Sequence, residues 1–146
     1  MRLGFRLSPG GMTRSEIDLY ADERELERLR RTVRRELATH PGQEALAREI
    51  GVSRIVLRCF LAFGLPLSKQ LQKIRECAED RPQVWVPFGA VLLATAVRDL
   101  PAAERARARL ELACALAGGF LRADRPLPAW LEEESSLGGV STPALH

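Results

Sequence analysis

The chain of 146 residues is poor in aromatic residues, lysine and histidine. Only 5% of its residues are aromatic, its two lysines are Lys69 and Lys73, and its histidines are His40 and His146. Because no supporting motif surrounds His40, a Ser–His–Asp hydrolase triad has no good candidate. The sequence also lacks a glycine-rich phosphate loop that follows a strand. We therefore expect a protein that is not an enzyme and that needs no cofactor.

Cysteine is also scarce, and long apolar runs are missing. The widely spaced Cys59, Cys77 and Cys114 match neither a disulfide framework nor a zinc site, so no metal is expected. This usage favours a reducing cytoplasm. The longest charge-free stretch, residues 82–97, contains two prolines and is too short for a membrane-spanning helix. Residues 1–6 lack the uninterrupted apolar core of a signal peptide.

Helix-forming residues dominate what is present. Leu, Ala, Arg and Glu are the most frequent types, and 46% of the residues are hydrophobic, which suffices for a core. The sequence predicts an all-α fold. The net charge of +3 permits a nucleic-acid partner without requiring one. Residues 83–146 hold six arginines and seven acidic residues, a net of −1, so the basic charge belongs to residues 1–82.

Apolar periodicity and its breakers divide the chain into four parts. We expect a flexible arm at 1–14, a first domain at 15–82, a helical extension at 83–131 and a disordered acidic, Ser/Gly-rich tail at 132–146. The expected helices are 15–39, 43–50, 53–61, 68–79, 87–99 and 101–117. Gly118 and Gly119 are expected to end the last of them.

Residues 43–61 carry the most informative pattern. Two short helices joined by a tight turn need a small residue at their contact, a turn residue that tolerates positive φ, and an N-cap for the second helix. Ala47, Gly51 and Ser53 supply these three features in register. The apolar anchors of the motif core are Leu46, Ile50, Val52, Leu57 and Phe60.

With Gln43 before them, these residues make the segment resemble the lambda-repressor/Cro-like (Xre-type) helix-turn-helix family. The resemblance covers residues 25–80. It implies a five-helix DNA-binding domain whose helix 53–61 enters the major groove of double-stranded DNA. It further implies a bacterial-type transcriptional regulator, with a repressor as the first expectation, that acts as a homodimer in the cytoplasm and on the nucleoid.

A helical wheel of residues 53–61 divides them into inward and outward sets. The outward set, which we expect to read bases, is Arg54, Ile55, Arg58 and Cys59. Contacts to the DNA backbone are expected from Gln43, Arg48, Ser53, Lys69 and Lys73. The alternative for Arg54 and Arg58 is a solvated face paired with acids such as Glu49.

A second group of arginines lines one face of the long helix 15–39. The stripe consists of Arg24, Arg28, Arg31 and Arg35. The acids around it are Glu23, Glu25, Glu27 and Glu36. We expect close pairs within the helix to neutralise the stripe, with binding of phosphate or of an acidic protein as the alternative.

Two questions stay open at this point. The loop 62–67 departs from the family pattern, because it is strongly apolar and offers no phosphate anchor. Phe63 and Leu65 either fold back onto the C-terminal helices or form a surface for a protein partner. In the second case the chain is an interaction module, such as an antitoxin, a phage protein or an adaptor, that uses the helix-turn-helix as a scaffold. Residues 83–131 either dimerise or cap the first domain.

Overall fold

The computed structural model describes the backbone of residues 14–137 and the side chains of residues 20–136. Over this range the chain is helical, without strands, as its composition predicts. The helices are α1 (Arg14–Leu37), α2 (Gln43–Ile50), α3 (Arg54–Leu61), α4 (Ser68–Glu79), α5 (Phe88–Val97), α6 (Ala102–Arg122) and α7 (Ala129–Leu137). None of them combines the length and the apolarity that crossing a bilayer needs.

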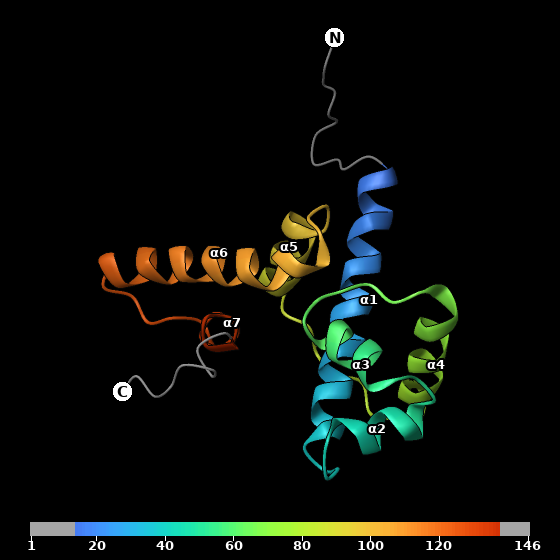
Figure 1. Cartoon of the computed structure of the whole chain (residues 1–146). Coiled ribbons are helices and arrows are strands. Elements are labelled where there is room, and N and C mark those ends of the chain that lie inside the picture. The colour runs from blue at the N-terminus through green and yellow to red at the C-terminus, as the bar shows by residue number, and fades with distance from the viewer. Residues whose placement is uncertain (1–13, 138–146) are drawn as a thin grey trace.

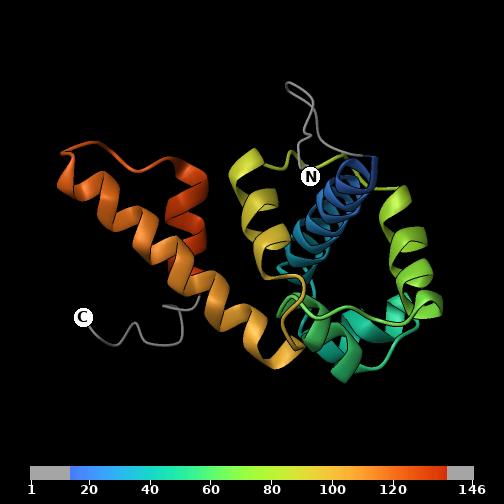
Figure 2. The same cartoon turned by 90° about the horizontal axis from the view of Figure 1, so that it is seen from above.

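Helix α1 is the element on which the rest of the fold is assembled. Helices α2, α3 and α4 surround its C-terminal half, and α5 lies along its N-terminal half (Figure 1). Helix α6 leads away from this body, and α7 folds back against α5 and α6 (Figure 2). Residues 83–131 therefore pack on the first domain through α5, which is the intramolecular arrangement that the sequence left open.

The body formed by α1–α4 has one apolar core. The side chains of Leu29, Leu46, Leu57, Phe60 and Ile74 are fully buried there. Around them are Leu26, Val33, Ala47, Ile50 and Ala78, which are also buried. Each of the four helices contributes at least one residue, so removal of this surface from water stabilises all of them together.

The helices α5–α7 share a second and smaller core. Leu93, Ala113 and Leu131 are its buried members, and the ring of Trp130 packs against them. Helix α7 approaches α5 closely at Gly89, because a Cβ atom at this position would lie 2.2 Å from a ring atom of Trp130. A glycine is required here for space.

Helix α6 runs past the pair of glycines that was expected to end it. It continues to Arg122, and the prediction of an end at Gly118 is wrong. The reason is tertiary, since Phe120 lies beyond the glycines and packs against the second core. Helix α6 ends at Arg122, and Asp124 follows it with a φ of 59°, which lets the Arg125 N–H donate to the carbonyl of Phe120 at 2.9 Å.

The acidic segment after residue 131 is ordered at its start. Residues 132–137 belong to α7, which corrects the prediction of a disordered tail over that part. Leu131 and Glu134 lie three residues apart on one face of α7, and both are buried. The rest of the expected tail, 138–146, and the expected arm, apart from Arg14, lie outside the described residues.

Candidate nucleic-acid interface

The α2–turn–α3 unit, residues 43–61, is built as its sequence predicts. Gly51 has a φ of 97°, and its N–H donates to the carbonyl of Ala47 at 2.8 Å, which ends α2. Ser53 caps α3, since its Oγ accepts from the N–H of Val56 at 3.1 Å. The left-handed turn and the serine cap are both confirmed.

The two faces of this unit differ sharply in exposure. The residues that face inward and are buried are Leu46, Ala47, Ile50, Leu57 and Phe60, with Val52 partly buried beside them. On the outer face of α3, the exposed residues are Arg54, Ile55, Arg58 and Cys59. The helix thus presents two cations, one aliphatic side chain and one thiol to its surroundings.

The acid that could have neutralised this outer face is engaged elsewhere. Glu49 lies 2.8 Å from His40 Nε2 and 3.3 Å from the guanidinium of Arg81. The hydrogen bond to Glu49 and a second one to the Glu36 carbonyl raise the pKa of His40. Neither Arg54 nor Arg58 forms an ion pair with any residue of the described range.

An open hollow of about 590 Å³ lies where α2 begins and α3 begins. It is lined by residues 41–45 together with Arg48 and Arg54. Gly42 provides no side-chain cap for α2, so the first N–H groups of that helix have no side-chain acceptor at the cap. Arg48 lies 3.9 Å from Glu44, and both side chains are largely exposed, so this pair is weak.

The other expected backbone contacts are dispersed. Lys73 Nζ donates to the carbonyl of Gly51 at 3.1 Å, so this lysine helps to satisfy the end of α2 from α4. Ser53 uses its hydroxyl to cap α3. Lys69 is exposed at the start of α4. The structure thus brings Gln43, Arg48 and Arg54 to one hollow and leaves the lysines on a different helix.

The apolar loop after α3 separates into a buried part and an exposed part. Phe63 is buried with a φ of 70°, and the N–H of Gly64 donates to the carbonyl of Cys59 at 2.7 Å. This is a Schellman motif with phenylalanine in the place that glycine usually takes. Phe63 therefore folds back toward the C-terminal helices, whereas Leu65 and Leu67 remain exposed.

Two arginines from other helices hold the C-terminal end of α3. Arg30 Nε on α1 donates to the carbonyl of Phe60 at 2.9 Å, and Arg105 Nη1 on α6 donates to that of Phe63 at 3.2 Å. Cations at the C-terminus of a helix interact favourably with its dipole. The position of α3 therefore depends on both parts of the molecule.

Behind this helix end lies a buried network of charges. Arg109 contacts both oxygens of Glu27 at 2.8 Å and both oxygens of Glu134 at 2.8 Å. Arg30 Nη1 lies 2.7 Å from Glu27. The side chains of Arg109, Glu27 and Glu134 are 2–3% exposed. The Arg109 guanidinium also lies over the ring of Phe63, 4.2 Å from its centroid.

Burial and pairing set the pKa values in this network. Burial would lower the pKa of Arg109, but the hydrogen bonds to Glu27 and Glu134 outweigh it and raise that pKa. Burial would raise the pKa of Glu27, but Arg109 and Arg30 lower it. Arg109 and Glu27 thus stabilise each other's charged forms.

Our sequence analysis missed this network, although a local signal for it exists. Glu23, Glu27 and Arg30 repeat at steps of four and three, in the same helical phase as Leu26 and Val33. Charged residues in the apolar phase of a helix indicate buried ion pairs. The same criterion, a charged residue in the apolar phase of a helix, also identifies Arg109 of α6.

We had expected close pairs within α1 to neutralise its arginine stripe. The structure instead connects arginines of the stripe to other elements. Arg31 pairs with Glu133 of α7 at 3.0 Å, and Arg35 donates to the carbonyl of Pro82 at 2.9 Å. The acids beside the stripe also reach other helices, since Glu25 pairs with Arg75 at 2.8 Å. Charged residues of α1 thus form ion pairs and hydrogen bonds with later parts of the chain.

Within residues 14–137, no group of three or more His, Cys, Asp or Glu side chains is arranged to hold a metal ion. Comparison of the chain with protein-family models, with curated proteins and with solved structures gives no match.

Proposed function

We propose that this protein is a transcriptional regulator that binds specific sequences of double-stranded DNA. In this proposal α2 and α3 form a helix-turn-helix within the first domain, which contains α1–α4, and α3 enters the major groove. The observation that carries it is the outer face of α3, where Arg54 and Arg58 are exposed and lie one turn apart. Arginine can donate two hydrogen bonds to guanine, and Ile55 between them suits the methyl group of thymine.

The hollow beside α3 supplies the phosphate contacts of this proposal. A helix N-terminus attracts anions through its free N–H groups and its dipole. The N-terminus of α2 borders the hollow, and Arg48 and Arg54 add positive charge to it. A DNA strand that follows the hollow would set the register in which α3 meets the bases.

Dimerisation is part of the proposal, because a single helix-turn-helix binds weakly and operators usually contain two half-sites. The C-terminal helices and the segment before them offer large apolar side chains to a second copy. The exposed residues of this kind are Trp85, Phe88, Leu92, Leu112, Leu116 and Leu121. Repression is the first expectation for the direction of regulation.

Fluorescence-anisotropy titration of the DNA upstream of the protein's own gene tests the function. We expect binding that is selective over scrambled DNA and that weakens steeply with salt. Arg54→Ala and Arg58→Ala should each cost about 1–3 kcal/mol, which is about a 5- to 150-fold rise in Kd. Arg107→Ala is the matched control, since Arg107 is exposed on α6 away from this face. Unchanged affinity in both α3 variants would overturn the placement.

A second function is supported by the apolar residues near the same face. Ile55, Leu65 and Leu67 are 60%, 58% and 72% exposed. As a protein-interaction module, the chain would use them to bind a partner by apolar contact. The same titration separates the two functions, because equal, weak binding to both DNAs would favour the interaction module. Leu67→Ser should then weaken partner binding while leaving the fold intact.

A further inference from the structure

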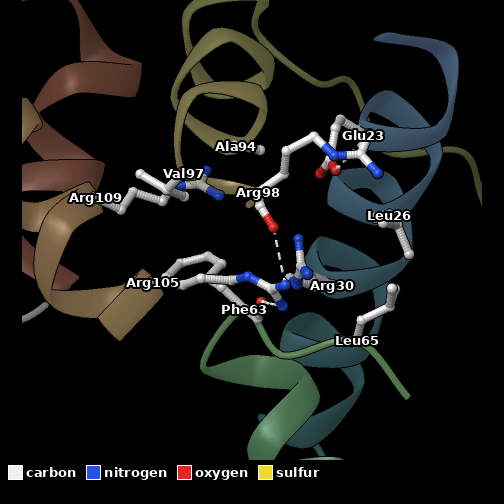
Figure 3. A pocket seen from close by; sticks show the side chains of 10 residues that line it. All are labelled: Glu23, Leu26, Arg30, Phe63, Leu65, Ala94, Val97, Arg98, Arg105 and Arg109. Carbon is white, nitrogen blue, oxygen red and sulfur yellow. Dashed lines mark hydrogen bonds and ion pairs between the residues drawn. The ribbon is translucent and has the colours of Figure 1, made fainter. Parts of the chain in front are cut away.

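We propose that a cavity between α1, α5 and α6 binds a small oxyanion, a carboxylate or phosphate group, through Arg98 and Arg105. The cavity has a volume of about 70 Å³ (Figure 3). Its lining comes from these three helices and from the loop after α3. We call it the arginine cavity. Its ligand binding does not depend on the proposed function in DNA binding.

The arginine cavity has more positive than negative groups. Four arginines line it (Arg30, Arg98, Arg105 and Arg109), whereas Glu23 is its single acidic lining residue. Two of these arginines are neutralised by the buried carboxylates of Glu27 and Glu134 outside the lining. Four guanidinium groups and three carboxylates leave one positive charge in excess, so a monoanion would balance the cluster.

The excess belongs to Arg98 and Arg105. The ion pairs of Arg98 are long, at 3.9 Å to Glu23 and 4.0 Å to the fully exposed Asp99. Arg105 forms no ion pair with a described residue and donates only to the carbonyls of Phe63 and Arg98, at 3.2 and 2.9 Å. The Arg98 guanidinium lies beside Glu23, whereas the Arg105 guanidinium forms no ion pair with a described residue (Figure 3).

Both arginines also have a donor group without an acceptor in the described part of the chain. Arg98 Nη1 and Arg105 Nε are buried and have no hydrogen-bond partner among the described residues. A buried donor on a charged group that lacks an acceptor costs more than a neutral one. An oxyanion supplies several acceptor oxygens and a compensating charge at once, which is why arginine pairs are the usual receptors for carboxylate and phosphate.

The size and the walls of the cavity select small groups. A volume of 70 Å³ is far below the roughly 300–1,000 Å³ of sites for drug-sized molecules. Leu26, Ala94 and Val97 form apolar walls, which strengthen charge interactions by excluding water. Burial raises the pKa of Glu23, and the nearby arginines act in the opposite direction.

The position of the site gives it a regulatory consequence. Arg105 donates both to the loop that ends α3 and to the end of α5. An anion that fixes Arg105 would therefore stiffen the connection between α3 and the C-terminal helices. This consequence for DNA binding rests on the proposed function, whereas the binding of the anion does not.

Thermal unfolding of the full chain tests the site directly. Sodium phosphate and sodium acetate are each titrated against sodium chloride at constant ionic strength. We expect the midpoint to rise with the logarithm of the anion concentration above the Kd, by about 3–6 °C at ten times the Kd. Arg98→Gln and Arg105→Gln should abolish this rise, and Arg107→Gln, an exposed neighbour on α6, should retain it.

Each outcome decides the proposal. A rise of the midpoint with phosphate, with acetate or with both that is lost in the arginine variants supports it and identifies the group that binds. No rise over sodium chloride in the unmodified protein overturns it, and so does an equal response in Arg98→Gln, which would be general stabilisation by excluded salts. Arg98 is only partly buried, so this variant keeps the test valid if Arg105→Gln fails to fold.

Discussion

The molecule has a body formed by α1–α4 and an arm formed by α5–α7. The two parts differ in the size of their apolar cores, and a buried charge network joins them. The body has ten buried apolar residues in one cluster, whereas the arm has three. Between them lies the network in which Arg109 joins Glu27 of the body to Glu134 of the arm. Apolar burial gives stability without strict geometry, and a buried ion pair gives strict geometry with little net stability. The body is thus the stable part, and the contact between body and arm is specific.

The chemistry of arginine makes this contact possible. Arg109 binds both carboxylates with two hydrogen bonds each, which uses the fork geometry of the guanidinium. A lysine ammonium has three donors and no planar fork, so it would leave carboxylate oxygens of the network unpaired. The near absence of lysine from the sequence is therefore matched by a structural use of arginine.

The largest expected effect comes from breaking this contact. Arg109→Leu leaves the buried Glu134 without its arginine and Glu27 with Arg30 as its close partner, and it should lower the free energy of unfolding by about 3–5 kcal/mol. Both tryptophans, Trp85 and Trp130, lie outside α1–α4, so fluorescence reports mainly on the arm and circular dichroism on all helices. In urea we expect the fluorescence transition to move below the dichroism transition. Coincident transitions, with Arg107→Leu as the control, would show that body and arm unfold as one unit.

The two apolar cores can be compared by equal truncations. Leu57→Ala in the body should cost about 4 kcal/mol and Leu131→Ala in the arm about 2–3 kcal/mol. Both side chains are fully buried, but the neighbours of Leu131 are partly exposed and can relax into the space. Urea denaturation measures both costs, and a larger loss for Leu131→Ala would reverse our ranking of the cores.

A smaller effect is expected where α7 crosses α5. Gly89→Ala places a methyl group against the ring of Trp130 and should cost about 1–3 kcal/mol by overpacking. The emission spectrum of Trp130 should shift as its ring moves toward solvent. A matched exchange at Gly42, where a Cβ meets no atom within 4 Å, should leave that spectrum unchanged.

The smallest effect concerns pH within the body. Since Glu49 and the Glu36 carbonyl raise the pKa of His40, its contribution to stability is fully present below the unfolded pKa of about 6.5. It is lost as pH rises through the folded pKa. His40→Gln should remove this part of the pH dependence, measured as the urea midpoint between about pH 5 and 8. An identical profile in the variant would assign the dependence to other groups.

Local patterns predicted the body well. The bounds of α2 and α4, the left-handed Gly51 and the Ser53 cap all follow from neighbours within a few residues. The exposed face of α3 also follows from its helical wheel, whereas its binding to DNA stays a prediction.

The structure of the arm was harder to predict from the sequence, because it depends on residues that are distant in the chain. Arg109 meets Glu27 across 82 residues of sequence, and no short pattern links the two. The acidic composition of α7 suggested disorder, but Glu134 is buried against that same arginine. The packing of Phe120 likewise keeps α6 helical past Gly118 and Gly119. The ion pairs that join body and arm were therefore not predicted from the sequence.

The location of Glu134 also sets the order in which the protein is completed during synthesis. A ribosome adds about 5–20 residues per second, so Glu134 emerges roughly 5–20 s after Glu27. During that interval α1–α4 can fold around their apolar core, while Glu27 has only Arg30 of its own helix as a close partner. Arg109 arrives next, and the last helix closes the network. The nascent chain thus carries a buried acidic position on its first helix that is fully paired only after residues 109 and 134 have been translated.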